Sequence, residues 1–163
     1  MIWLIRKLQE VLAALVLRDN GKKMSEEEEF FGLTKNFKLK EFRCRDGSDV
    51  PEDLMENVRL LAENLQVLRD HIGKPIRIIS GYRSKKYNTK INGAKRSQHM
   101  LAKAADIKIS GMTPKEVRET ILELIQEGKM HSGGVGIYTT FVHYDVRGWN
   151  ARWKGSGVKD DIK

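Results

Sequence analysis

The sequence contains a single cysteine, Cys44, among its 163 residues. One thiol can neither form a disulfide within the chain nor provide a cysteine-based zinc site, so both classes of stabilised small protein are excluded. Proline is also scarce, with three residues, and low-complexity tracts are absent, which argues against a disordered chain. The hydrophobic content of 40% is enough for one domain with an ordinary core.

Long hydrophobic runs are missing as well. Near the N-terminus the uninterrupted apolar run is only Val11 to Leu17, which is too short to span a membrane, and no small-residue cleavage site of a signal peptide follows it. Residues 1–30 are predicted to form an amphipathic helix and a linker. Three interpretations stay open: a helix on a membrane surface, a helix packed on a partner, or sequence upstream of a domain that starts near Met24.

Acidic residues are in the minority, with 22 Asp and Glu against 30 Lys and Arg, a net charge of +8. This surplus favours a polyanionic partner, such as nucleic acid or a bacterial cell wall with carboxylates on its peptide stems. The basic residues are spread along the chain, and no nucleic-acid-binding motif is recognised, so specific nucleic-acid binding is not expected. A basic surface that is merely solvated is the remaining alternative.

Hydrophobic periodicity and turn residues predict a single α+β domain over residues 31–153, followed by a flexible tail at 154–163. We expect a small, largely antiparallel sheet with flanking helices. The predicted helices cover residues 51–72 and 113–129, and the predicted strands cover 75–79, 104–109, 133–138 and 141–148, the last two forming a hairpin.

Histidine and aspartate lie on the same faces of two predicted strands. Alternate side chains of a strand share a face, so His143 and Asp145 lie together on one strand, and Asp106 lies on the strand that follows the loop with His99. If these strands are neighbours, His99, Asp106 and His143 converge. Two imidazoles and one carboxylate suit zinc and leave its fourth position for water. The alternative from spacing alone is a set of ordinary polar residues satisfied by turns and lysines.

The stretch SQHMLAKAAD, residues 97–106, resembles a motif of the zinc D-Ala-D-Ala carboxypeptidase and murein endopeptidase family, which shares its fold with the hedgehog signalling domain. The family pattern is Ser-x-His-x-x-Gly-x-Ala-x-Asp. Four positions match it, namely Ser97, His99, Ala104 and Asp106. The glycine is replaced by Ala102, and a position that needs positive φ would strain an alanine.

Two further segments resemble motifs of the same family, in the same order. SGYRS at residues 80–84 is similar to the upstream motif whose arginine faces the substrate, and GVGIYTTFVHYDVRG at residues 134–148 is similar to the closing motif with the third zinc ligand. The resemblance covers residues 37–153. It implies a hedgehog-like, DD-peptidase-like fold.

The resemblance also implies roles for individual residues. His99, Asp106 and His143 are implied as ligands of zinc (Zn²⁺), and Arg83 is implied as the cation that polarises the scissile carbonyl. The chemistry agrees, because a fixed guanidinium stabilises an amide carbonyl as it gains negative charge.

The sequence departs from the family pattern at the position of the general base. Many members carry an acid three positions before the last zinc histidine, where this chain has Thr140, which cannot accept a proton. The nearest acid is Asp145, on the same strand face as His143. It either accepts a proton from water or orients a zinc ligand or Arg83.

These observations predict a zinc metallopeptidase that hydrolyses amide bonds in peptidoglycan stem peptides, as a D-Ala-D-Ala carboxypeptidase or a murein endopeptidase, including an endolysin-like enzyme. The aromatic residues Tyr82, Tyr138, Trp149 and Trp153 either line a groove for the peptide or cover the core. The rival hypothesis is a catalytically weak or inactive zinc-containing module of the same fold that binds the cell wall or a partner.

The predicted place of action is the cell wall, in the periplasm or outside the cell, and we expect a monomer. Since no convincing signal peptide is present, two routes are open: export or anchoring through the N-terminal helix, and release at phage lysis.

Overall fold

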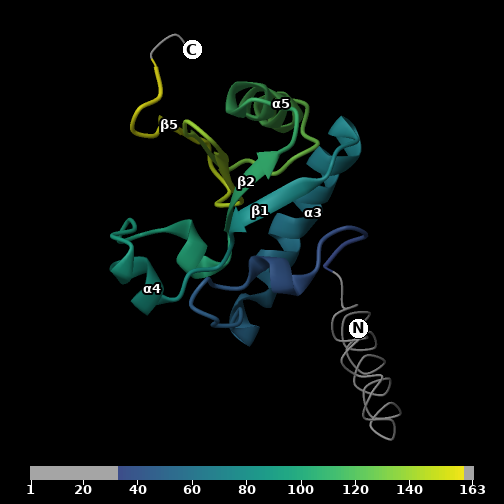
Figure 1. The fold of residues 1–163 in the computed structure, drawn as a ribbon. Helices are drawn as coiled ribbons and strands as arrows, with labels where there is room; N and C mark the ends of the chain where they lie inside the picture. The colour runs from purple at the N-terminus through teal and green to yellow at the C-terminus, as the bar shows by residue number, and fades with distance from the viewer. Residues whose placement is uncertain (1–32, 160–163) are drawn as a thin grey trace, which may run out of the picture.

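The computed structural model describes residues 33–159. These residues form a five-stranded sheet with helices packed against it (Figure 1). The amphipathic helix predicted within residues 1–30 lies outside the described residues. Within residues 33–159 none of the helices is long and apolar enough to cross a bilayer.

The strand order in the sheet is β1-β2-β4-β3-β5. All neighbouring pairs are antiparallel except β3 and β5, which are parallel. The predicted α+β class with a largely antiparallel sheet is therefore confirmed. The strands are β1 (Ile76–Ser80), β2 (Ala104–Ile109), β3 (Gly134–Ile137), β4 (Val142–Asp145) and β5 (Ala151–Lys154).

Strand β5 was not predicted from the sequence. Its four residues alternate between half-buried and exposed and carry no hydrophobic run that would mark a strand. It forms because β3 offers a free edge and pairs with it, from Gly134 opposite Ala151 to Ile137 opposite Lys154. The sheet thus extends one residue into the segment predicted to be a flexible tail.

Two long helices cover one face of the sheet (Figure 1). Helix α3 (Met55–Ile72) follows a short 3₁₀ turn, η3 (Glu52–Leu54), and ends at Gly73, which adopts φ 64°. Helix α5 (Pro114–Gln126) begins with a capping box, in which the Thr113 hydroxyl accepts from the Glu116 N–H and the Glu116 carboxylate accepts from the Thr113 N–H.

The hydrophobic core lies between these helices and the inner face of the sheet. Leu61 and Leu65 of α3 and Ile121 of α5 are fully buried and belong to one cluster with Ile107 of β2 and Tyr144 of β4. Burial of each such side chain contributes roughly 1.5–3 kcal/mol. Because alternate strand residues point to opposite faces, this packing leaves the other face of β2 and β4 to polar residues.

Three short helices connect these elements, namely η2 (Leu39–Phe42), α4 (Lys85–Lys90) and η4 (Gln98–Leu101). The loop between β1 and α4 is held on both sides. Its Tyr82 N–H donates to the Phe42 carbonyl at 2.8 Å, and its Arg83 N–H donates to the His99 carbonyl at 3.0 Å. The loops that contain Arg83 and His99 are therefore adjacent.

Ala102 occupies the left-handed region, with φ 52° and ψ 25°, directly after η4. The family motif has glycine at this position, and the sequence analysis noted that a positive φ here would strain an alanine. An L-residue there costs about 1–2 kcal/mol. The methyl group of Ala102 is almost fully buried, and this burial offsets part of the cost. The chain therefore keeps the turn into β2 without a glycine.

Candidate metal centre

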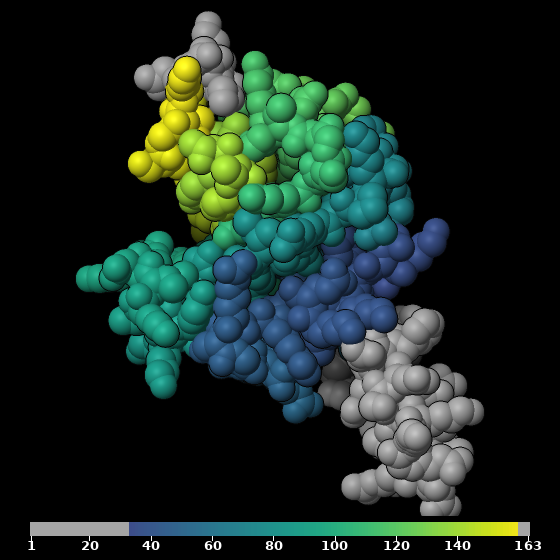
Figure 2. Space-filling view, viewed as in Figure 1, coloured from purple at the N-terminus to yellow at the C-terminus, as the bar shows by residue number. Residues whose placement is uncertain are grey.

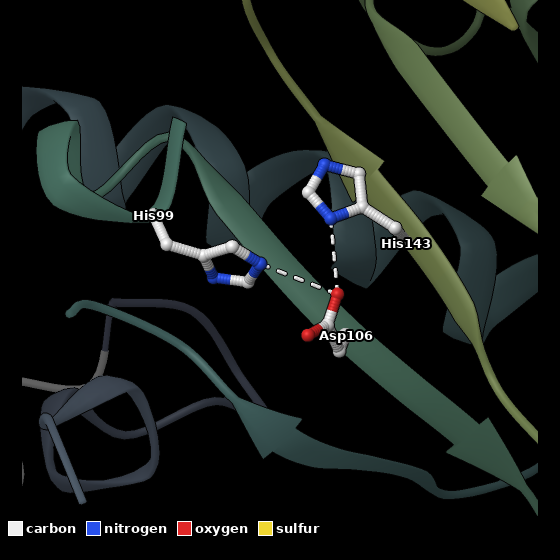
Figure 3. Close-up of side chains that lie close together, drawn as sticks. All are labelled: His99, Asp106 and His143. Atoms are coloured by element: carbon white, nitrogen blue, oxygen red, sulfur yellow. Dashed lines mark hydrogen bonds and ion pairs between the residues drawn. The ribbon is translucent and has the colours of Figure 1, made fainter. Parts of the chain in front are cut away.

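Three polar side chains converge on the face of the sheet opposite the core (Figure 3). Asp106 of β2 and His143 of β4 are direct partners in the antiparallel register. His99 reaches the same place from η4. All three are buried, and their ligand atoms lie within 4.8 Å of one another. The convergence predicted for neighbouring strands is thus present in the structure.

In each histidine, one ring nitrogen forms a hydrogen bond with a residue other than these three. Nδ1 of His99 lies 2.7 Å from the carbonyl oxygen of Gly81, and a carbonyl only accepts, so Nδ1 carries the proton. Nε2 of His143 lies 2.9 Å from Oδ2 of Asp145. In the neutral rings the opposite nitrogens, Nε2 of His99 and Nδ1 of His143, therefore carry lone pairs.

Both of these lone pairs face the same carboxylate oxygen, Oδ1 of Asp106. The distances are 3.3 Å from Nε2 of His99 and 3.0 Å from Nδ1 of His143. Lone pairs that face one another in a buried place repel unless a proton or a cation lies between them. Two imidazole nitrogens and one carboxylate oxygen, with their outer atoms already hydrogen-bonded, are the donor set of a divalent metal site. The residues present fit a metal ion.

The two histidines differ in basicity. Burial lowers the pKa of His99 below its ordinary value. Burial acts on His143 in the same direction, but hydrogen bonds with Asp106 and Asp145 outweigh it and raise the pKa of His143. The pKa of Asp106 is lowered, because its hydrogen bonds with the two histidines outweigh the effect of burial. A proton on His143 competes with a metal, so metal binding weakens as pH falls.

Arg83 lies beside the group and contacts its carboxylate from the other side. Its Nη2 donates to Oδ2 of Asp106 at 2.8 Å, and its Nε donates to the hydroxyl of Ser80 at 3.0 Å. Nη1 of Arg83 has no hydrogen-bond acceptor among residues 33–159, and the side chain is 16% exposed. Two contacts therefore fix the Arg83 guanidinium beside Asp106 and leave Nη1 outside them. We call His99, Asp106 and His143 the lone-pair cluster.

Asp145 lies on the far side of His143 from Asp106 and is fully buried. Besides His143, it accepts hydrogen bonds from the Gly134 N–H and from the Arg147 side chain, whose Nε and Nη2 donate at 2.8 and 2.7 Å. Burial raises the pKa of Asp145, but these hydrogen bonds outweigh it, so the net pKa lies below the ordinary value. Its oxygens are thus occupied by donors.

The sequence profile of one family, described as peptidase M15, matches residues 34–145. The match includes all five residues of the predicted site and most of the described chain. This chain belongs to the peptidase M15 family.

Curated relatives agree with this assignment. The peptidoglycan L,D-endopeptidase MepK of Escherichia coli K12 is 37% identical over 80 residues, which cover 45% of this chain and 41% of the relative. MepK of Shigella flexneri matches to the same extent. The matched region thus spans about two fifths of the length of these relatives.

Arg147 is a site residue of this M15 peptidase that the sequence interpretation missed. Its guanidinium binds both oxygens of Asp145 and lies over the rings of Trp149 and Trp153, 5.9 and 5.5 Å from their centroids. The alternation His143, Asp145, Arg147 was visible in the sequence and would have indicated a shared face.

The aromatic residues divide into different roles. The indole of Trp153 lies 5.0 Å from the imidazole of His143, and its Nε1 donates to the Tyr138 hydroxyl at 3.1 Å. Gly136 permits this, since a Cβ there would overlap the Trp153 ring. Trp149 is 61% exposed, and Tyr82 packs against the core. Of the four, Trp153 is the one in ring contact with a predicted ligand.

Thr140 lies in the exposed turn between β3 and β4. It borders a cavity of about 430 Å³ formed by the start of β1, the end of β2 and the start of α5. None of the five predicted site residues lines this cavity. The cavity is therefore separate from the lone-pair cluster of His99, Asp106 and His143. Thr140 has no acidic group and cannot serve as the general base of the metal centre.

Proposed function

We propose that this M15 peptidase holds zinc through His99, Asp106 and His143 and hydrolyses an amide bond in peptidoglycan stem peptides. The observation that carries the proposal is the pair of histidine lone pairs aimed at one buried carboxylate oxygen. Nitrogen and oxygen donors of this kind suit zinc. The peptidoglycan substrate is supported by the 37% identity with MepK over the matched region.

In this proposal zinc, when bound, acts as a Lewis acid and lowers the pKa of water. Hydrolysis joins the water oxygen to the carbonyl carbon, breaks the C–N bond and returns a proton to the leaving amine. Arg83 contributes a fixed positive charge where the carbonyl oxygen becomes negative. Its contacts with Asp106 and Ser80 keep the guanidinium in place before the substrate arrives.

Asp145 acts in this proposal as a positioning residue. Its Oδ2 accepts from Nε2 of His143 and so fixes the tautomer in which Nδ1 faces the metal position. Its remaining lone pairs accept from Arg147 and the Gly134 N–H. A carboxylate that is fully buried and saturated with donors is a poor acceptor for a proton from water, so of the two roles predicted for Asp145 we favour the orienting one.

Replacement of Asp145 by Asn tests this role. We expect the zinc affinity to fall about 10–100-fold, because an amide is a weaker partner for the His143 N–H than a carboxylate. Titration against a chelator of known affinity measures this change. Asp49→Asn, which alters an exposed carboxylate paired with Arg43, is the matched control. Lost turnover with unchanged zinc affinity would contradict the orienting role and assign Asp145 as the base.

Of the two cleavage types predicted, we propose the endopeptidase, because the matched relatives are named L,D-endopeptidases. A carboxypeptidase needs a cation for the terminal carboxylate of its substrate. In the part of the chain that the structure describes, the arginine side chains that contact the site carboxylates are Arg83 and Arg147, and both are already paired with those carboxylates.

The second candidate function is a zinc-containing module of the same fold that binds the wall and hydrolyses slowly or not at all. The observation that favours it concerns the two positions considered for the general base: Thr140 cannot accept a proton, and the carboxylate of Asp145 already accepts hydrogen bonds from His143, Arg147 and the Gly134 N–H. Both candidates bind zinc, so turnover separates them.

Mass spectrometry of purified peptidoglycan fragments tests the proposed function. The full chain is incubated with fragments after zinc loading, after treatment with a chelator, and after zinc is restored. We expect cleavage within the stem peptide in the first and third samples only. Loss of a terminal alanine instead would establish the carboxypeptidase. Unchanged fragments in spite of bound zinc would favour the binding module.

A further inference from the structure

A basic projection interrupts the sequence between the two loops of the site. We call residues 84–97, which contain α4 and the loop after it, the basic lobe. Figure 2 shows this segment, coloured teal, extending away from the rest of the molecule. The lobe contains no acidic residue, and five of its side chains are exposed cations, namely Lys85, Lys86, Lys90, Lys95 and Arg96.

The cations of the basic lobe have no counterions within the described residues. The ion pairs found in residues 33–159 lie elsewhere, for example between Arg43 and Asp49 and between Lys129 and Glu127. Lys86 and Lys90 are four residues apart on α4, and like charges at this spacing cost about 0.2–0.5 kcal/mol. An external anion would remove this repulsion.

The basic lobe has a defined internal structure. The Ser84 hydroxyl accepts from the Tyr87 N–H and caps α4. Asn88 is buried, and its side-chain Nδ2 donates to the Ala94 carbonyl at 3.1 Å, while its backbone carbonyl accepts from the Gly93 N–H at 2.8 Å. The five cations are therefore presented on a folded support.

The base of the lobe is the candidate metal centre. Arg83 precedes the lobe and His99 follows it within two residues, and the Arg83 N–H donates to the His99 carbonyl at 3.0 Å. The chain thus leaves the site, forms the lobe and returns to the site. A ligand bound on the lobe therefore lies next to the loops that contain Arg83 and His99.

We propose that the basic lobe binds the carboxylates of peptidoglycan stem peptides next to the stem that is cut, and so holds the enzyme on its polymeric substrate. This inference rests on the proposed function, which supplies a polymer with repeated carboxylates. Nucleic acid fits the lobe less well. Helix α4 has only six residues, and the lobe carries one aromatic residue, Tyr87, which is half-buried, whereas single strands are held by stacking on exposed aromatic rings.

The test compares two charge-reversed forms of the full chain. The lobe variant combines Lys85→Glu, Lys86→Glu and Lys90→Glu. The control variant carries the same charge change at exposed positions of the body, with Lys35→Glu, Lys74→Glu and Arg77→Glu. Each protein is sedimented with intact peptidoglycan sacculi freed of phosphate polymers, at low and at high salt, and is also assayed on a short soluble stem peptide.

We expect the lobe variant to bind sacculi about tenfold or more weakly than the control variant at low salt, and this difference to shrink at high salt. Turnover of the soluble stem peptide should be equal in the two variants. Sacculi whose carboxylates have been converted to neutral amides should bind the unmodified protein as weakly as native sacculi bind the lobe variant.

Three results would overturn the proposal: equal binding of the two variants to sacculi, undiminished binding to amidated sacculi, or loss of DNA binding in the lobe variant without loss of wall binding. Failure of the proposed function looks different. In that case neither sacculi nor the soluble peptide is cut by the unmodified protein, while sedimentation still reports whether the lobe binds the wall.

Discussion

His143→Ala is expected to abolish the stabilisation of this chain by zinc and to reduce peptidoglycan cleavage to background. Two of the three donor atoms remain, but Nδ1, the donor that β4 places opposite Asp106, is removed. A ligand that binds only the folded state at 100 times its Kd stabilises that state by about 2.7 kcal/mol. For a chain of this size that amounts to a rise in Tm of about 5–10 °C, which the variant should lose.

Thermal unfolding with and without zinc, and the zinc content after gel filtration, measure this effect independently of activity. The variant should fold, because Asp145 keeps Arg147 and the Gly134 N–H as partners. His71→Ala, at the exposed end of α3, is the matched control and should respond to zinc like the unmodified protein. Equal zinc stabilisation of the two variants would rule out His143 as a ligand.

Arg83→Ala is expected to lower turnover about 10²–10³-fold while zinc affinity changes by less than about tenfold. In the proposed function the guanidinium acts on the carbonyl oxygen from its fixed place beside Asp106, and its loss removes none of the three donor atoms of His99, Asp106 and His143. Arg83→Lys should give an intermediate loss, because an ammonium keeps the charge but cannot contact Asp106 and Ser80 in the geometry of the guanidinium fork.

Steady-state kinetics on a soluble stem peptide, together with the zinc titration, separates the two roles open to Arg83. Arg77→Ala, on the exposed face of β1, is the control and should leave both quantities unchanged. If turnover and zinc affinity fall in parallel, Arg83 acts by holding Asp106 and not by contacting the substrate.

Much of the architecture followed from local patterns in the sequence. The apolar spacing of α3, with Gly73 after it, and the capping residues Thr113 and Glu116 of α5 are signals contained within a few residues. Strand alternation likewise places His143 and Asp145 on one face whatever the rest of the fold. The membership in the peptidase M15 family was also predicted from short motifs, and the profile match over residues 34–145 confirms it.

Strand β5 and the position of Trp153 were not predictable in this way. A strand of four half-buried residues depends on the free edge of β3, and the contact of Trp153 with His143 depends on a glycine in that neighbouring strand. These are pairings across the sheet, and no local pattern in β5 encodes its partner.

What the sequence determined by itself was the set of chemical groups, the faces of the strands on which they lie and the helices that cover the core. The tertiary structure decided how these groups are used. Register across β2 and β4 brings Asp106 opposite His143, the carbonyl of Gly81 sets the tautomer of His99, and Arg147 saturates the carboxylate of Asp145. The physical reason is that a hydrogen bond depends on distance and direction between atoms far apart in the chain, and only the folded backbone specifies these.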